Sequence, residues 1–475
     1  MNIYIEMEVK SRELQRAVLL GMAAAYRGHR VLAGKLKGRL ANDHYRLPPG
    51  VYHDKDLMVR DPHKGRAAKL RTRGFKITAQ DEEHGLLSST YDQFAATRFT
   101  EASFDVVDRY VCWGDFDAAA LRQRYPSSHT KLLVAGSPRV DFWRPDFARY
   151  FDSPQSLPAQ DPARRILIVS NLVGPLSPNP LWLTLQTSQR YNMGAQGESI
   201  SRRFFEHQLD RLALVQEYAS AVERLAHDYP ETEVVVRPHP VEAWGAWRPF
   251  LADLPNLTVT RQGPLGSWIR NSDVVVQNAC TSGFEALVTG TPMVAYCPQA
   301  IGADKLPNTL APQADTTAAL SAAVGDALHR PGKFERKQSQ QWPEAILQRF
   351  ASLEGAWATD QIVDAWESLD SGNLSEPWSL RQLKTRDRAR QLRRRAFDTA
   401  HRVRKHPSGE DRPTDSHGET PNQQFVYQQK FSDITQGELE EIRQGIARVR
   451  PELAAVRLSL VGPQLFTFQH GPSRS

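Results

Sequence analysis

An arginine and a histidine follow an apolar run in the sequence VVVRPHP, at residues 234–240. The apolar run predicts a buried strand, and Pro238 and Pro240 restrict the turn after it. In open α/β sheets, ligands bind outside the carboxyl ends of the strands. Arg237 and His239 fall at such an end, where both can donate hydrogen bonds to a phosphate. The alternative is a plain strand exit with a surface histidine.

A second polar group lies in DVVVQNACTSGFEALVTGTPMVAYCP, which predicts a strand, a tight turn, a helix and another strand. Thr281, Ser282 and Gly283 fall where the helix begins. Hydroxyls and free backbone N–H groups at a helix N-terminus form an anion site. Glu285 lies in the first turn, where its carboxylate can accept ribose hydroxyls. The alternative is a helix capped by Thr281 or Ser282, with Glu285 as a favourable first-turn charge.

Three adjacent carboxylates, Asp81, Glu82 and Glu83, lie in ITAQDEEHGLL after another predicted strand. Mutual repulsion raises the pKa of at least one of them. A carboxylate with a raised pKa can serve as general base toward a sugar hydroxyl. The alternative is a solvated acidic turn.

The sequence DFD at 115–117 superficially matches a metal-binding DxD motif. It follows Gly114 and precedes the helical stretch AAALRQRY, so Asp115 or Asp117 is better explained as a helix N-cap. We therefore expect neither a metal nor a cofactor. The sequence has no P-loop, GxGxxG or GxSxG motif, so ATP hydrolysis, dinucleotide binding and serine-hydrolase chemistry are unsupported.

The composition is that of a globular protein with sizeable cores: 475 residues, 40% of them hydrophobic, with a net charge of +6. The cysteines Cys112, Cys280 and Cys297 form no CxxC pair, so we expect neither a zinc knuckle nor a disulfide framework. This use of cysteine fits a protein of the reducing cytoplasm. The N-terminus lacks the pattern of a secretory signal, and no apolar run is long enough to span a membrane.

Strands and helices must alternate to place these motifs at strand ends. Ile3–Val9 alternates apolar and polar residues and predicts a strand, and Arg12–Tyr26 carries a helical apolar stripe that ends at Gly28. Further short apolar runs predict an α/β domain with parallel strands over residues 1–151. The Pro-, Ser- and Asp-rich segment 152–164 is typical of a linker.

A second α/β series predicts a domain over 165–370. Its strands are continuously apolar, as in a doubly wound parallel sheet that is buried on both faces. An extension over 371–475 follows, in which 381–405 is dense in arginine. Residues 406–423 have almost no apolar side chains and predict a flexible linker. A helical pattern returns around Leu439–Ala447.

Taken together, these stretches resemble the bacterial surface carbohydrate biosynthesis proteins, which are related to the retaining β-Kdo transferases and the bacterial sialyltransferases. The resemblance rests on IYIEMEVKSREL, LPPGVYHDK, DEEHG, VCWG, AGSPRVD, RPHP and QNACTSGFEAL, with QQKFSDIT near the C-terminus. It implies a GT-B architecture, in which two Rossmann-like, doubly wound lobes face each other across a cleft. It also implies a CMP-sugar donor, held mainly by the second lobe.

The resemblance also implies roles for the donor-side residues. His239 and Pro240 look like the HP motif that holds the CMP phosphate or the cytidine. Thr281 and Ser282 look like the paired hydroxyls that bind the phosphate or the sugar carboxylate. Glu285 then holds the ribose.

On the acceptor side, Asp81, Glu82 and Glu83 look like the acidic motif that supplies the general base. His84 separates this motif from the glycine, unlike the usual sialyltransferase pattern. A retaining enzyme with a covalent intermediate also needs a carboxylate nucleophile. The segment NLVGPLSPNP, after the first strand of the second lobe, contains no carboxylate.

The resemblance predicts a glycosyltransferase that moves Kdo or a related nonulosonic acid from a CMP-sugar to a glycan or lipid-linked glycan acceptor, as in capsule or lipopolysaccharide O-antigen assembly. Two alternatives stay open: a non-catalytic nucleotide- or glycan-binding component of an assembly complex, and a UDP-sugar epimerase of the same architecture. We expect a cytoplasmic location.

The basic stretch 381–405 has two interpretations. As a helix it could lie on the anionic inner face of the inner membrane, near lipid-linked acceptors. The alternative is a solvated helix that packs across the two lobes. Nucleic acid is not an expected partner, because no aromatic residues are interleaved in a repeating pattern.

Overall fold

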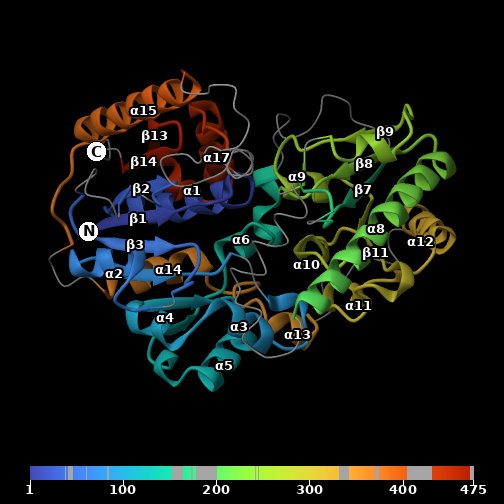
Figure 1. The fold of residues 1–475 in the computed structure, drawn as a ribbon, viewed down its shortest axis with the longest axis horizontal. Helices are drawn as coiled ribbons and strands as arrows, with labels where there is room; N and C mark the ends of the chain where they lie inside the picture. The colour runs from blue at the N-terminus through green and yellow to red at the C-terminus, as the bar shows by residue number, and fades with distance from the viewer. Residues whose placement is uncertain are drawn as a thin grey trace. The chain divides into compact units, whose positions relative to one another are not determined.

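The computed structural model describes residues 1–37, 39–40, 47–59, 61–82, 85–151, 164–172, 175–177, 200–240, 242–243, 245–330, 342–369, 374–403 and 431–470. The chain forms two compact units. The first comprises Met1–Glu83, Phe99–Asp141 and Phe350–Ser475, and the second comprises His84–Arg98 and Phe142–Arg349. Figure 1 traces the chain through both units from blue to red.

The sheet of the first unit has the strand order β13-β14-β2-β1-β3-β4-β5-β6. From β2 to β6 in this order, each pair of neighbouring strands is parallel. The other two pairs, β14 with β2 and β13 with β14, are antiparallel. The chain therefore changes direction across the sheet between β1 and β3, as at the switch point of a doubly wound fold. The strands are β1 (Asn2–Glu6), β2 (Arg30–Gly34), β3 (Val51–Asp54), β4 (Lys76–Ala79), β5 (Arg109–Cys112), β6 (Leu132–Val134), β13 (Val456–Gly462) and β14 (Leu465–His470).

Helix α1 (Lys10–Tyr26) follows β1 as the sequence predicts, and its apolar stripe is buried. The Glu13 carboxylate accepts the backbone N–H groups of Glu8 and Val9 at 2.7 and 3.2 Å, which satisfies donors ahead of the first turn. The other helices of this unit are α2 (Gly65–Thr72), α4 (Glu101–Val106), α5 (Asp115–Arg124), α6 (Pro138–Asp141), α14 (Ala358–Glu367), α15 (Leu380–Val403) and α17 (Gln436–Val449).

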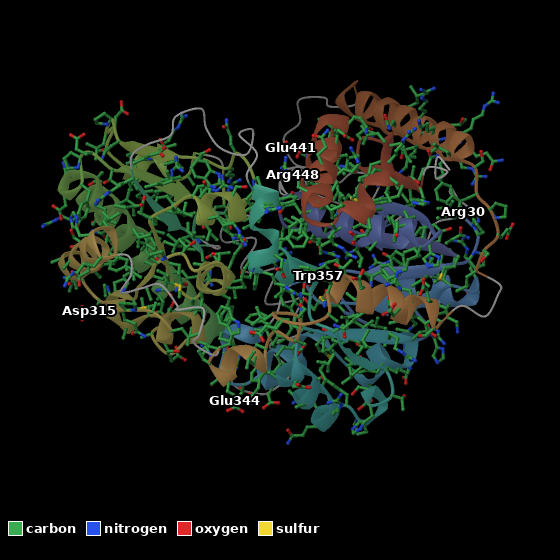
Figure 2. All side chains as sticks on the ribbon, turned by 180° about the vertical axis from the view of Figure 1, so that it is seen from behind. Arg30, Asp315, Glu344, Trp357, Glu441 and Arg448 are labelled. Atoms are coloured by element: carbon green, nitrogen blue, oxygen red, sulfur yellow. The ribbon has the colours of Figure 1, made fainter. Side chains whose placement is uncertain are left out.

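The end of the chain completes the sheet of the first unit. The helical pattern around Leu439–Ala447 is confirmed as α17, along which Figure 2 shows the side chains of Glu441 and Arg448. The sequence did not predict the following hairpin, β13 and β14, which lies beside β2 (Figure 1). The Phe468 ring fills the space that a side chain on Gly21 of α1 would need. The hairpin therefore belongs to the core of this unit.

Gly34, at the end of β2, has a φ of +131°, and a Cβ there would lie 2.1 Å from the Gln464 carbonyl oxygen. A backbone atom cannot move aside as a flexible side chain can. We expect Gly34→Ala to lower the free energy of unfolding by about 2–4 kcal/mol in urea denaturation. Gly28→Ala is the control, because Gly28 also has a positive φ but no atom within 4 Å of its Cβ position. It should cost only about 1 kcal/mol, and equal losses for the two variants would contradict the close approach.

The sheet of the second unit has the order β9-β8-β7-β10-β11-β12, and every neighbouring pair is parallel. This is the 3-2-1-4-5-6 order of a Rossmann fold, with its switch point between β7 and β10. Strands β7, β10 and β11 are buried along their whole length, as their apolar sequences predict. The strands are β7 (Arg165–Val169), β8 (Glu233–Arg237), β9 (Leu257–Val259), β10 (Val274–Gln277), β11 (Met293–Tyr296) and β12 (Gln313–Ala314).

Helices cover the second sheet through two groups of apolar side chains. One group joins α8 and α12 to the strands, and the other joins α9 and α10 to them. The helices are α3 (Asp92–Arg98), α8 (Ile200–Asp228), α9 (Leu265–Arg270), α10 (Thr281–Thr289), α11 (Leu306–Thr309), α12 (Thr317–His329) and α13 (Glu344–Leu347).

Several predicted segments fall outside the described residues. They are almost all of the 152–164 linker and the whole of the 406–423 linker. The domain boundaries at 151, 165 and 370 stay predictions. Within the described residues, no helix is both long and apolar enough to cross a membrane.

Candidate nucleotide site

The switch point of the second sheet brings together the segments that follow β7 and β10. Asn171, two residues beyond β7, donates its side-chain N–H to the Ala279 carbonyl at 3.2 Å. In doubly wound sheets the crevice outside the strand ends at this point is where ligands bind. The predicted residues Thr281, Ser282 and Gly283 follow directly, at the start of α10.

The turn between β10 and α10 is strained and held in place. Ala279 has a φ of +47°, a left-handed conformation that costs energy for a residue with a side chain. Asn308 of α11 is fully buried, and its Oδ1 accepts the Ala279 N–H and the Gln277 side-chain N–H, both at 2.9 Å. Its Nδ2 donates to the Gly302 carbonyl at 2.8 Å. Strained backbone that its surroundings hold in place gathers at functional sites.

The N-terminus of α10 lacks an internal cap. The N-cap residue is Cys280, whose side chain makes no capping hydrogen bond. Within the described residues, the backbone N–H groups of Thr281 and Ser282 have no acceptor. The Ser282 side chain is only 2% exposed, and its Oγ has no hydrogen-bond partner in the described structure. Three donors at one helix end therefore lack partners, which is the condition for an anion site.

Two further predicted residues lie on α10. A side chain on Gly283 would meet the Pro307 side chain at 2.9 Å, so glycine allows α11 to approach α10. The Glu285 carboxylate Oε1 lies 2.7 Å from the position that a Cβ on Gly266 of α9 would occupy. Glu285 thus points toward the beginning of α9, and Thr281 and Glu285 are half-buried.

Arg237 lies at the end of β8 as predicted, but it is bound by carbonyls. Its guanidinium donates to the backbone oxygens of Gln262 and Gly263 at 2.6 and 2.9 Å and stacks on the Trp268 ring. Burial, with Arg261 nearby, lowers the pKa of Arg237 to about 10. Its predicted contact with phosphate stays a prediction.

His239 and Pro240 follow β8 and are half-buried. The His239 carbonyl accepts a hydrogen bond from Arg261 at 2.8 Å, which fixes the backbone of the predicted HP motif. The histidine therefore lies on the same carboxyl edge of the sheet as the start of α10. The structure brings the two predicted donor motifs to one edge.

Sequence reasoning missed two residues at this edge, Arg211 and Glu242. Arg211 extends from α8, and its Nη1 donates to the Asn171 carbonyl at 2.8 Å. Burial lowers the pKa of Arg211, opposed by the negative charge of Glu242 and the nearby Cys280 thiol. An arginine inside a long helix carries no local signal that it faces a strand end.

Glu242 joins the segments after β7 and β8. One carboxylate oxygen accepts the Ser170 hydroxyl at 2.6 Å and the Leu172 N–H at 2.8 Å, and the other accepts the Trp247 indole N–H at 3.0 Å. Burial raises the pKa of Glu242, and these hydrogen bonds oppose the rise. The carboxylate thus positions both segments beside Arg211.

In the first unit, the acidic segment follows β4 as predicted. Glu82 is buried and forms an ion pair with Arg16 of α1, with Oε1 2.8 Å from Nε. Asp81 is also buried, and its backbone carbonyl accepts the Trp113 indole N–H at 3.0 Å. Glu83, like His84, lies outside the described residues. The general-base role of the segment stays a prediction.

Burial raises the pKa of more than one carboxyl at this sheet edge, among them Glu6 at the end of β1. Burial raises its pKa to about 8, although the Arg66 guanidinium and a 2.8 Å hydrogen bond from the Tyr52 hydroxyl favour the charged form. Asp54, at the end of β3, accepts a hydrogen bond from Arg66 at 2.5 Å. The switch point of the first sheet therefore carries a buried cluster of acidic and basic groups.

The raised pKa of Glu6 predicts a pH effect on stability. The folded state binds the Glu6 proton more tightly than the unfolded chain does. The contribution of this proton to the free energy of unfolding is therefore full below about pH 4.5 and is lost as the pH rises toward 8. We expect Glu6→Gln to be more stable than the wild type by about 1–2 kcal/mol at pH 8.5, with a smaller difference at pH 5. Urea denaturation at both pH values measures this. The exposed Glu231→Gln is the control, and a Glu6→Gln difference that does not change with pH would contradict the burial.

The DFD sequence begins a helix as predicted, but the N-cap residue is Gly114, and Asp117 is the third helical residue. Asp117 lies in the first turn of α5, and its carboxylate accepts the N–H groups of Trp113 and Gly114 at 3.0 and 2.9 Å. Burial raises the pKa of Asp117 to about 7, and these backbone hydrogen bonds oppose the rise. Asp117 thus forms the N3 part of a capping box, and neither aspartate is the N-cap itself.

No family model and no curated protein matches the chain. Among solved structures it is similar to UDP-GlcNAc 2-epimerase from Neisseria meningitidis bound to UDP-GlcNAc, at 12% identity over 78% of this chain and 100% of that one, with a TM-score of 0.43. It is similar to the wall teichoic acid polymerase TagF with CDPG, at 10% identity over 79% and 90%, with a TM-score of 0.45. The kitacinnamycin glycotransferase is 16% identical over 77% and 98%, with a TM-score of 0.40.

With TM-scores below 0.5, these likenesses carry no weight for function. The fold class rests on the two sheets themselves. Both are doubly wound, and together they make an α/β protein of two Rossmann-like units, the composition of a GT-B fold. The predicted fold class is confirmed, while the resemblance to surface carbohydrate biosynthesis proteins stays a prediction.

Proposed function

We propose that this chain is a glycosyltransferase that moves an acidic sugar, Kdo or a related nonulosonic acid, from a CMP-sugar to a surface polysaccharide acceptor. The observation that carries the proposal is the uncapped start of α10 at the switch point of the second sheet. The N–H groups of Thr281 and Ser282 and the Ser282 hydroxyl lack partners within the described residues. A phosphate bound there gives all three donors an acceptor.

The chemistry of the leaving group supports this assignment. As the bond between the sugar and CMP breaks, the phosphate gains negative charge. Donors that are already oriented stabilise such charge without reorganisation. We assign this role to the start of α10, to His239 and to Arg211, and we assign the ribose hydroxyls to Glu285. We infer that the CMP-sugar is the only small molecule required, without a metal.

On the acceptor side, we assign the general base to the acidic segment Asp81, Glu82 and Glu83. It follows β4, next to the switch point of the first sheet, where doubly wound sheets bind ligands. Because Asp81 and Glu82 are buried, we expect acceptor binding to rearrange this segment locally. We further propose that the enzyme acts in the cytoplasm at the inner face of the inner membrane, where lipid-linked acceptors are made available.

A donor panel tests the proposal. The protein is incubated with CMP-Kdo, CMP-sialic acid or UDP-GlcNAc, with and without acceptor glycan, and nucleotide release and sugar products are measured. We expect CMP release that depends on the acceptor and that persists in EDTA. Epimerised UDP-GlcNAc would replace the proposal with the epimerase alternative. Nucleotide binding without turnover of any donor would replace it with the non-catalytic alternative.

A further inference from the structure

A hollow of about 430 Å³ lies in the first unit between α15 and the hairpin of β13 and β14. Lys384 and Arg388 of α15 form one wall, and Ile434 with the hairpin turn at 460–463 forms another. This volume is within the ~300–1,000 Å³ range of small-molecule sites. Neither the fold nor the nucleotide site requires it.

The helix is fixed against the hairpin by a buried contact. Asp387 of α15 is 1% exposed, and its Oδ2 accepts the Gln391 side-chain N–H at 2.7 Å, while Oδ1 lies 3.5 Å from Nε of Arg39. A Cβ on Gly462 would lie 1.9 Å from the Asp387 Oδ2, so only glycine permits this approach. Leu383, one turn earlier, is also buried. The wall of the hollow is therefore held in a defined position.

The two basic side chains of that wall form no ion pair with a carboxylate in the part of the chain that the structure describes. Lys384 and Arg388 are one helical turn apart, on the same face of α15. Within the described residues, neither forms an ion pair or a hydrogen bond. Asp433 is the acidic residue that also lines the hollow. Two positive charges against one negative charge favour an anionic occupant.

The remaining lining is apolar, and the apolar character continues along the helix. Ile434, Leu460, Val461 and Pro463 line the hollow. Leu392, one turn beyond Arg388, is 65% exposed. Side chains with nitrogen ends project from α15 in Figure 2. Basic groups beside exposed apolar groups on one helix are typical of binding at an anionic membrane surface.

We propose that this hollow binds the phosphate headgroup of an anionic phospholipid. Lys384 and Arg388 contact the phosphate, and the apolar lining with Leu392 contacts the first methylene groups of the lipid. This inference goes beyond the proposed transfer reaction, because it concerns residues of the first unit that have no role assigned in that reaction. It gives the basic segment of the sequence a specific binding surface.

Co-sedimentation with vesicles tests the proposal. We expect the wild-type protein to sediment with vesicles of phosphatidylcholine and phosphatidylglycerol at low salt, and not with phosphatidylcholine alone. Lys384→Gln/Arg388→Gln should weaken binding about 30-fold, since each basic residue near the surface contributes about 1 kcal/mol. Lys64→Gln/Arg124→Gln removes the same charge from exposed positions elsewhere in this unit and should bind as the wild type does.

Three further arms make the outcome specific. Leu392→Gln, at an exposed position, should also weaken vesicle binding, and inorganic phosphate should compete only weakly. Equal binding by the wild type and the Lys384→Gln/Arg388→Gln variant would overturn the proposal, as would no sedimentation at low salt. Binding to single-stranded RNA that the double variant loses, without vesicle binding, would also overturn it. Transfer to a soluble acceptor should be unchanged in the double variant, so failure here is distinguishable from failure of the transferase proposal.

Discussion

An Arg211→Met variant is expected to bind CMP about 100-fold more weakly than the wild-type protein. Arg211 donates to the Asn171 carbonyl, and Asn171 in turn contacts Ala279 in the turn before α10. The guanidinium therefore lies at the edge where the proposed phosphate binds. A charge-assisted hydrogen bond contributes about 1.5–3 kcal/mol, and about 1.4 kcal/mol corresponds to a factor of 10.

Calorimetric titration with CMP measures this affinity. Arg224→Met is the matched control, since Arg224 lies on the same helix, is well exposed and forms an ion pair with Asp228. Arg211→Lys should recover part of the affinity, because a point charge remains but the planar fork does not. If Arg211→Met binds CMP with wild-type affinity and has an unchanged melting temperature, Arg211 does not contribute to CMP binding.

Arg16→Met should lower the free energy of unfolding of the first unit by about 3–5 kcal/mol. Arg16 is 1% exposed and lies between two buried carboxylates, Glu82 at 2.8 Å and Glu13 at 3.8 Å. Its Nη2 also donates to the Glu6 carbonyl at 3.4 Å. Removing the cation leaves buried negative charges without compensation, which costs more than the pair itself contributes.

Urea denaturation of three variants tests this contact. Arg16→Met/Glu82→Gln should recover much of the loss, because it removes one of the two uncompensated charges. Lys10→Met is the control on the same helix, where the partner Glu438 is 38% exposed, and it should cost at most about 1 kcal/mol. A loss below about 1 kcal/mol for Arg16→Met would show that the buried ion pair is not formed in solution.

Local patterns predicted the parts of the site that depend on short stretches of chain. Continuous apolar runs fix the strands of the second sheet, and small polar residues after β10 fix the start of α10 at Thr281. Parallel strands end at one edge, so the His239 segment and the start of α10 had to lie on the same edge. These predictions needed only periodicity and strand direction.

Long-range pairing could not be predicted in the same way. Arg16 and Glu13 are both buried on α1, and the closer ion pair of Arg16, with Glu82, depends on the segment that follows β4. Arg237 was predicted from its position at a strand end, but the carbonyls that its guanidinium contacts belong to a later turn, at Gln262 and Gly263. The partner in each case is distant in sequence and has no motif.

The C-terminal hairpin shows the same limit. β14 pairs with β2, and the two strands come from opposite ends of the chain. Nothing local in 465–470 indicates that partner. Only the folded structure shows how the hairpin packs on the first unit: the Phe468 ring lies against Gly21, and the Gln464 carbonyl lies against Gly34.

A crystal structure of the protein with CMP bound tests the central claim most directly. We predict the phosphate within hydrogen-bond distance of the N–H groups of Thr281 and Ser282 and of the Ser282 hydroxyl, with Glu285 on the ribose. CMP bound at another place in the second unit, or an empty start of α10 at saturating CMP, would contradict the account.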